Sequence, residues 1–501
     1  MAAVTETGEL YSSPVAFIYI FNLIIGVGAL TMPKAFAGAG WLVSLVLIGL
    51  LAFMSFVTAT FMVEAMAAAN ALLRIKAKEK LEQQGVVNRY TEAEQADGSH
   101  SENVEDFDSL DGEKEPLIDF SKDKPEQHLY EITTRVEMGQ MAKMFYSKNG
   151  LRLFYLCIGL YLYGDLAIYA AAVPKSLTLV SCIMPHSDSH QTMNQSHVGN
   201  ISKSNKTDDE CWGQITKGNV YRIYLLIFTV TLGPFTFFNL QKTKYLQIIT
   251  TFMRWLAFSM MIILALIRIH QGKGKNLHVS AGDFGGVPNL FGVCIYAFMC
   301  QHSLPSFITP MKSKSHVNLI FVVDFGIILL FYSLLSFSAM FAFDDLLDLY
   351  TLNFHAYDPF IHYFLALFPV FTLSTNFPII SVTLRDNLKN LFYRAGHPYP
   401  WVIDKIVFPL VTILPPIAVA FATDNLEILV GVTGSYAGTG VQYIIPATLV
   451  YFARKQLREL ANSYDNKHRS KFRQRSWIFF VLIWAVIGIA FITANHIITR
   501  K

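Results

Sequence analysis

The sequence predicts an all-α polytopic membrane protein, and its composition and the length of its apolar runs carry that prediction. Apolar residues make up 53% of the 501 residues, and charged residues make up 15%. Apolar runs long enough to cross a bilayer, about 20 residues each, recur along the whole chain. The net charge of +3, without a compact basic patch, gives no indication of a nucleic-acid partner. We therefore expect the lipid bilayer to surround most of the chain.

Hydrophobic run length predicts about eleven transmembrane helices. They fall near residues 14–36, 42–68, 150–182, 220–240, 246–269, 288–310, 318–341, 359–384, 404–422, 426–452 and 477–498. The predicted domains are a cytosolic N-terminus (1–13), helices 1–2 (14–73), a cytosolic loop (74–148), helix 3 (149–182), an external loop (183–218), helices 4–10 (219–453), a basic cytosolic loop (454–476) and helix 11 (477–498).

Basic residues set the predicted orientation. Lysine and arginine gather in connections that would share one side of the membrane, at 74–80, 143–152, 242–244, 312–314, 385–394 and 454–475. The positive-inside rule makes that side cytosolic, with the N-terminus there and the C-terminus lumenal or extracellular. Loop 183–218 lies on the opposite side and holds three N-glycosylation sequons, at Asn194, Asn200 and Asn205. Cys182 and Cys211 bracket this loop and can form a disulfide in an oxidising compartment.

The cytosolic loop 74–148 is acidic and poor in apolar residues, so we expect it to be largely disordered. Within it, Glu113 precedes Leu117 and Ile118 in a pattern similar to the acidic dileucine signal that clathrin adaptors read. This pattern favours a lysosomal or endosomal membrane, with the plasma membrane as the alternative. An ordinary solvated linker is the other interpretation of the motif.

The first and sixth spans contain features that a plain membrane helix avoids. In span 1, Gly26, Gly28 and Pro33 weaken the helix, and Asn22 puts an amide at membrane depth. Span 6 is likewise apolar, then polar from Cys300, and then reaches a proline. Interrupted helices at corresponding positions indicate a midplane binding site and a five-plus-five inverted repeat. A merely glycine-rich, closely packed helix is the alternative for span 1.

The pattern Asn22…Gly26-x-Gly28-x-Leu30-x-x-Pro33-x-Ala35 resembles the first helix of the amino acid/auxin permease branch of the amino acid–polyamine–organocation superfamily. Residues 296–312, 163–169, 378–385 and 431–447 are similar to helices 6, 3, 8 and 10 of that branch. The chain is identified as a divergent relative of the sodium-coupled neutral amino acid transporters. The resemblance implies a LeuT-like fold with broken helices 1 and 6, and amino acid transport.

An amino acid needs donors for its carboxylate and acceptors for its ammonium group, and unwound backbone supplies both. We therefore expect substrate contacts at the two breaks: Ile25, Gly26, Val27, Gly28, Ala29, Phe298, Met299, Cys300, Gln301 and His302. Asn22 matches an asparagine at the cation site of the sodium-coupled relatives, whose partner is a threonine in span 8. Here Asn376 stands at the threonine's position and Thr375 precedes it, so sodium and protons stay open as coupling ions.

Asp165 in span 3 is the candidate for proton coupling, because an intramembrane carboxylate is costly unless it is paired, protonated or beside water. A structural ion pair with Arg254 is the alternative. Asp324 has a weaker claim, since it is expected near the cytosolic end of span 7, within reach of water. Lys34 is expected to extend toward the lumenal surface, and His302 to serve either as a pH-sensitive gate or in simple packing.

These residues predict a secondary active transporter of amino acids or similar small solutes, coupled to H⁺ or Na⁺, that works by alternating access and needs no cofactor. The alternative is a membrane nutrient sensor that binds an amino acid and signals through loop 74–148. We expect no enzyme activity and no metal site, because the spans contain no HExxH motif, no paired aspartates and no serine–histidine dyad.

Overall fold

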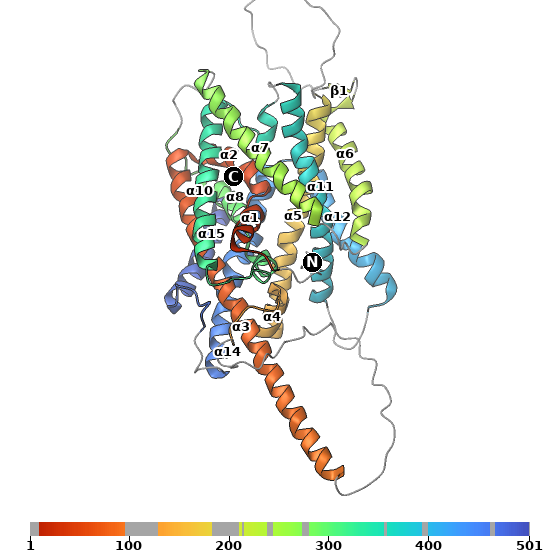
Figure 1. The fold of residues 1–501 in the computed structure, drawn as a ribbon. Helices are drawn as coiled ribbons and strands as arrows, with labels where there is room; N and C mark the ends of the chain where they lie inside the picture. Colours follow the sequence, from red (N-terminus) through yellow and green to blue (C-terminus); the bar gives the residue numbers. More distant parts are fainter. Residues whose placement is uncertain are drawn as a thin grey trace, which may run out of the picture.

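The computed structural model describes residues 10–95, 129–182, 210–212, 215–237, 244–272, 280–354, 358–392, 399–460 and 466–499. Long helices run side by side as one bundle, and α3 extends beyond it at one end (Figure 1). Nine helical stretches in these ranges are long and apolar enough to cross a membrane. They contain α3 (Trp41–Gln95), α5 (Lys148–Cys182), α6 (Lys217–Leu232) with η1 (Gly233–Phe237), α7 (Lys244–His270), α10 (Val317–Ala342), α11 (Pro359–Leu391), η4 (Ile403–Val407) with α12 (Phe408–Ala422), α13 (Leu426–Thr433) through α14 (Ile445–Leu460), and α15 (Arg475–Thr499).

Two further predicted spans are each divided into halves. The first consists of α1 (Ser13–Ile24) and α2 (Val27–Ala39), whose axes differ by 56°. The sixth consists of α8 (Val287–Ala297), η2 (Gln301–Ser303) and α9 (Leu304–Ile308). The prediction of an all-α polytopic membrane protein is confirmed. The number of crossings and the inverted repeat stay predictions, because α8 and α9 are each too short to cross a bilayer alone.

Proline begins several of these helices, and glycine allows some of them to pack closely. Five helices, α1, α8, α9, α11 and α12, have proline in their first turn, where the missing amide costs no intrahelical hydrogen bond. Span 10 contains two π-helical segments, η5 (Gly434–Gly438) and η6 (Gly440–Ile444), which widen the helix between α13 and α14. A Cβ added to Gly434 would lie 1.9 Å from the Gly292 carbonyl oxygen, so α8 and span 10 pack backbone against backbone.

A short antiparallel ribbon precedes α6. Strands β1 (Glu210–Trp212) and β2 (Ile215–Thr216) form it, and a disulfide joins Cys211 of β1 to Cys182 at the end of α5, with a Cα–Cα distance of 4.9 Å. We call the side of the bundle that carries this bond the disulfide face. The predicted glycosylation sites Asn194, Asn200 and Asn205 lie outside the described residues, as do Glu113, Leu117 and Ile118 of the sorting motif.

Both ends of loop 74–148 are ordered, and its middle, which we expect to be disordered, lies outside the described residues. Helix α3 continues to Gln95, and a short helix, α4 (Met138–Phe145), precedes α5. Residues 129–137 dock on α3 because Asn70 and Arg74 bind their backbone. The Asn70 Oδ1 atom accepts hydrogen bonds from the Thr133 and Thr134 amides at 3.2 and 2.8 Å, and the Arg74 Nη1 atom donates to the Leu129 carbonyl at 2.8 Å. Apolar burial of Ile132 adds to this docking.

Candidate functional site

The break in span 1 leaves backbone donors without acceptors. Helix α1 ends at Ile24, Ile25 is extended, and α2 begins at Val27. The amides of Gly26, Val27 and Gly28 donate to no acceptor in the described chain, whereas the Ala29 amide reaches the Gly26 carbonyl at 3.2 Å. The N-terminus of α2 therefore presents three amides and the positive end of a helix dipole, an arrangement that suits an anion.

The break in span 6 is braced by side chains. The Gln301 Oε1 atom accepts a hydrogen bond from the Cys300 amide at 3.0 Å, and Nε2 donates to Ser55 Oγ and Thr58 Oγ1, each at 3.1 Å. The Ser55 hydroxyl donates to the Phe298 carbonyl at 3.0 Å. Both ends of the Gln301 amide are thus used within the protein, and α3 fixes this break.

Tyr332 on α10 connects the two breaks. Its hydroxyl is fully buried and lies 3.0 Å from the Ala297 carbonyl oxygen, at the end of α8, and 3.3 Å from the Ile24 carbonyl oxygen, at the end of α1. Sequence reasoning missed this residue. Its only sequence signal is a polar tip in the middle of an apolar span.

Asp165 lies in the middle of α5, 5% exposed, and accepts a hydrogen bond from the Tyr296 hydroxyl on α8. The ring of Tyr161 lies 6.3 Å from that of Tyr296 and 5.6 Å from that of His302. Asp165 is therefore connected to the break in span 6 through aromatic side chains. The His302 Nδ1 atom is buried without a hydrogen-bond partner among the residues described.

The structure shows no ion pair between Asp165 and Arg254 among the described residues. The Arg254 guanidinium on α7 instead donates to the Asn22 backbone carbonyl at 2.5 Å. Carbonyls at the C-terminal end of α1 carry the negative end of the helix dipole, and this is a favourable place for a cation. Arg254 thereby stabilises the end of α1 and leaves the Asp165 carboxylate to Tyr296.

The candidate cation residues are not joined by hydrogen bonds. The Asn22 side chain is buried, and neither its oxygen nor its nitrogen has a partner in the part of the chain that is described. The Thr375 hydroxyl donates to the Thr372 carbonyl within α11 at 2.9 Å, and Asn376 is half-buried beside it. No hydrogen bond between described residues links Asn22 to either of them.

Asp324 is more buried than the sequence predicted, and Lys34 has an ion-pair partner. Asp324 is fully buried, not within reach of water, and neither of its carboxylate oxygens has a hydrogen-bond partner among described residues. Lys34 is partly exposed, as expected, and its Nζ atom lies 3.5 Å from Glu427 Oε2 on α13.

A family of transmembrane amino acid transporter proteins matches residues 11–79 and 139–494 of this chain. The chain belongs to the transmembrane amino acid transporter protein family. This confirms the resemblance that the broken first and sixth spans carry. The match omits residues 80–138, which fall in the long connection between the second and third spans of this family member.

Several relatives are similar in sequence to this chain over nearly its whole length. Transmembrane protein 104 of Homo sapiens is 55% identical over 504 residues, which cover 99% of each chain. The transmembrane protein 104 homolog of Drosophila melanogaster is 42% identical over 510 residues and that of Caenorhabditis elegans 36% identical over 531 residues, each covering 98% of both chains.

Proposed function

We propose that this family member is a secondary active transporter that moves an amino acid or similar small solute by alternating access. The three unpaired amides of Gly26, Val27 and Gly28 carry the proposal, because they offer a carboxylate a ready-made set of donors. The Leu23 carbonyl at the end of α1 accepts no hydrogen bond within the described chain, so an acceptor for an ammonium group lies on the other side of the same break.

Uptake into proteoliposomes tests this proposal. Purified protein is given a panel of labelled amino acids under an imposed proton or sodium gradient, and we expect gradient-driven accumulation. Val27→Pro deletes one of the three amides at a helix position that tolerates proline, so we expect the KM to rise about tenfold. Val27→Ala keeps the amide and serves as the matched control. Equal KM values for the two variants would contradict a carboxylate site at α2.

We infer that protons are the coupling ion and that Asp165 carries them. The hydrogen bond from Tyr296 supports this inference, because it connects the Asp165 carboxylate to the residue just before the last residue of α8. Protonation removes the negative charge that this bond stabilises, so a proton on Asp165 changes the contact with span 6.

Asp165→Asn is expected to abolish accumulation driven by a proton gradient while solute exchange without a gradient persists. Full proton-driven uptake by this variant would rule out Asp165 as the coupling site. Sodium-driven uptake that is lost in Asn22→Ala would place the cation in span 1 instead, where the unpaired Asn22 amide oxygen is a suitable ligand.

A nutrient sensor is the second candidate, and the docking of residues 129–137 favours it. Arg135 Nη2 donates to Ser306 Oγ of α9 at 2.6 Å, and the Ser306 hydroxyl donates to Glu137 Oε1 at 3.2 Å. The long connection thus contacts the short half of span 6 directly. Amino acid binding without measurable flux in the proteoliposome assay would favour the sensor over the transporter.

We further propose that loop 183–218 is lumenal and glycosylated and that the protein resides in lysosomal or endosomal membranes. The Cys182–Cys211 disulfide supports an oxidising environment on that face. Glycosidase treatment should increase the gel mobility of the protein, and replacing Asn194, Asn200 and Asn205 with Gln should remove that shift.

Leu117→Ala with Ile118→Ala should move the protein to the cell surface if clathrin adaptors read the motif.

A further inference from the structure

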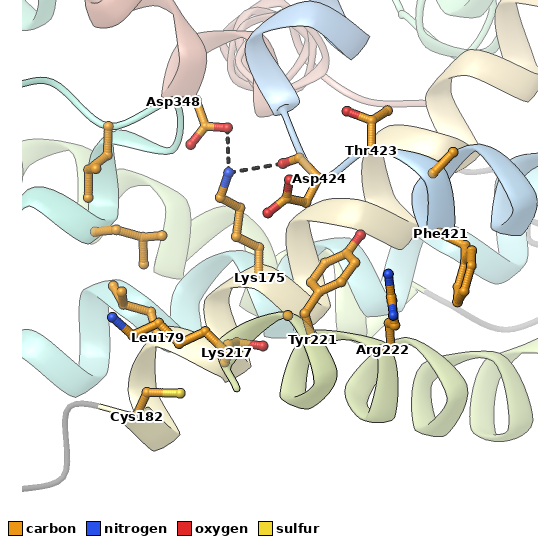
Figure 2. A pocket seen from close by; sticks show the side chains of 15 residues that line it. Lys175, Leu179, Cys182, Lys217, Tyr221, Arg222, Asp348, Phe421, Thr423 and Asp424 are labelled. Atoms are coloured by element: carbon orange, nitrogen blue, oxygen red, sulfur yellow. Dashed lines mark hydrogen bonds and ion pairs between the residues drawn. The ribbon is translucent and has the colours of Figure 1, made fainter. Parts of the chain in front are cut away.

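A pocket of about 380 Å³ opens on the disulfide face (Figure 2). It lies between the end of α5, the start of α6, the connection before η3 (Tyr350–Phe354), and the turn that joins α12 to α13. It is separate from both breaks, because none of the residues that line it belongs to span 1 or span 6.

An ion pair between Lys175 and Asp348 forms the base of the pocket. The Lys175 ammonium of α5 lies 2.6 Å from Asp348 Oδ2 and donates to the Asp424 carbonyl at 2.9 Å. The same Asp348 oxygen accepts a hydrogen bond from the Leu426 amide at 2.9 Å. Lys175 and Asp348 therefore satisfy each other and join α5, the connection between α10 and α11, and the start of α13.

Above this base, two opposite charges remain without ion pairs. The Arg222 guanidinium of α6 lies over the Phe421 ring, 5.0 Å from its centroid, and the described chain gives it no carboxylate partner. The Asp424 carboxylate also has no ion pair or hydrogen bond from described residues. Figure 2 shows Arg222 on α6 and Asp424 on the turn before α13, and both line the same pocket.

The remaining walls are mixed, because Thr178, Lys217 and Thr423 line the pocket beside apolar side chains. The Tyr221 hydroxyl donates to the Ala420 carbonyl at 2.8 Å, which fixes the position of the ring. Leu179, Leu347 and Leu352 supply apolar surface on the other side. A cation, an anion and an apolar wall around one cavity match the carboxylate, ammonium group and side chain of a neutral amino acid.

We propose that this pocket is a second amino acid site, at which Arg222 binds the carboxylate and Asp424 binds the ammonium group. The identity of the ligand as an amino acid rests on the proposed function, whereas the cavity itself is observed. Lys175 follows Asp165 by ten residues on α5, which is about 15 Å along the helix. The pocket therefore lies nearer than Asp165 to the end of α5 that carries the disulfide.

Photolabelling of the full-length protein in nanodiscs tests this proposal. The probe is a leucine analogue with a diazirine in its side chain, and labelled peptides are mapped by mass spectrometry. We expect adducts on peptides that contain residues 217–222 or 421–426, and we expect excess leucine to prevent them. Arg222→Gln and Asp424→Asn should each lower this labelling about tenfold.

Arg268→Gln is the matched control, because Arg268 also lies over an aromatic ring, 4.9 Å from the Phe343 centroid, but outside the pocket. It should leave pocket labelling unchanged. Isovalerate has only the carboxylate and isoamylamine only the ammonium group, so neither should protect as well as leucine. Full protection by isovalerate alone would overturn the amino acid assignment in favour of a simple anion site.

The two proposals fail in different ways. Labelling of peptides at the breaks, without labelling of the pocket, would overturn the second site and leave the transporter proposal intact. Labelling of the pocket that is lost in Arg222→Gln, without uptake in proteoliposomes, would support the second site and contradict the transporter proposal. Pocket labelling that is unchanged in both Arg222→Gln and Asp424→Asn would also overturn the second site.

Discussion

Tyr332 shows how one hydroxyl can stabilise two interrupted helices. The last carbonyls of a helix have no partner within it, and a buried carbonyl that loses its donor cannot recover water in a membrane. Tyr332 lies within hydrogen-bonding distance of such a carbonyl in α1 and of another in α8. The hydroxyl therefore makes up for hydrogen bonds that the two breaks remove.

Tyr332→Phe is expected to lower the free energy of unfolding by about 1–2 kcal/mol, because the one hydroxyl proton that two buried carbonyls share is lost while the ring volume is kept. Thermal melting of the purified protein in detergent measures the change. Tyr451→Phe is the control, since Tyr451 is 37% exposed and its hydroxyl makes no hydrogen bond with described residues. Equal melting temperatures for the two variants would contradict the bridging role of Tyr332.

At the scale of elements, the contact between α2 and α8 brings the breaks together. A Cβ added to Gly28 would lie 2.6 Å from the Ala297 Cα and 2.8 Å from its Cβ. Glycine at this position allows the start of α2 to pack directly against the end of α8. The close approach places the unpaired amides of α2 beside the break that follows Ala297.

Gly28→Ala is expected to destabilise the protein by about 1–3 kcal/mol and to lower uptake, because overpacking separates the two half-helices. Gly38→Ala is the matched control in the same helix, since a Cβ there has no atom within 4 Å. Melting temperature and initial uptake rate are measured for both. Wild-type behaviour of Gly28→Ala would show that α2 and α8 can separate without cost.

Across the whole molecule, ion pairs close both ends of the bundle. On the disulfide face, Lys175 pairs with Asp348. On the opposite face, Arg454 of α14 binds Glu64 of α3 through two hydrogen bonds of 2.8 and 2.7 Å, and the Ser470 amide donates to the same carboxylate at 3.0 Å. If the chain works by alternating access, as proposed, these two contacts would open in turn.

Glu64→Gln is expected to reduce stability by about 3–5 kcal/mol, because the Arg454 charge stays largely buried without its partner. We also expect faster modification of the buried Cys300 by a thiol reagent, as the face opposite the disulfide opens more often. Lys405→Gln is the control, since its pair with Asp404 is exposed and contributes about 1 kcal/mol or less. Unchanged Cys300 reactivity in Glu64→Gln would show that this ion pair does not hold the face closed.

Hydrophobic run length and the positions of glycine and proline predicted the membrane class and the break in the first span. Apolar run length and the placement of glycine and proline are local properties, so the halves α1 and α2 lie close to where the sequence predicts them. The amino-acid composition did not predict the ordered structure at the two ends of loop 74–148. Docking of residues 129–137 depends on Asn70 and Arg74, which precede them by more than fifty residues.

Only the tertiary structure decided which polar groups meet. Both Arg254 and Tyr296 were available to Asp165, yet the packing of α5 and α8 gives the carboxylate to Tyr296, and Arg254 reaches the Asn22 carbonyl. The proposed roles of Tyr332, Arg222 and Asp424 likewise depend on neighbours that are distant in sequence. The physical reason is that most buried polar groups in a folded protein have a hydrogen-bond partner. Which partner it finds depends on the rotation and depth of whole helices, and hydrophobic pattern does not specify these.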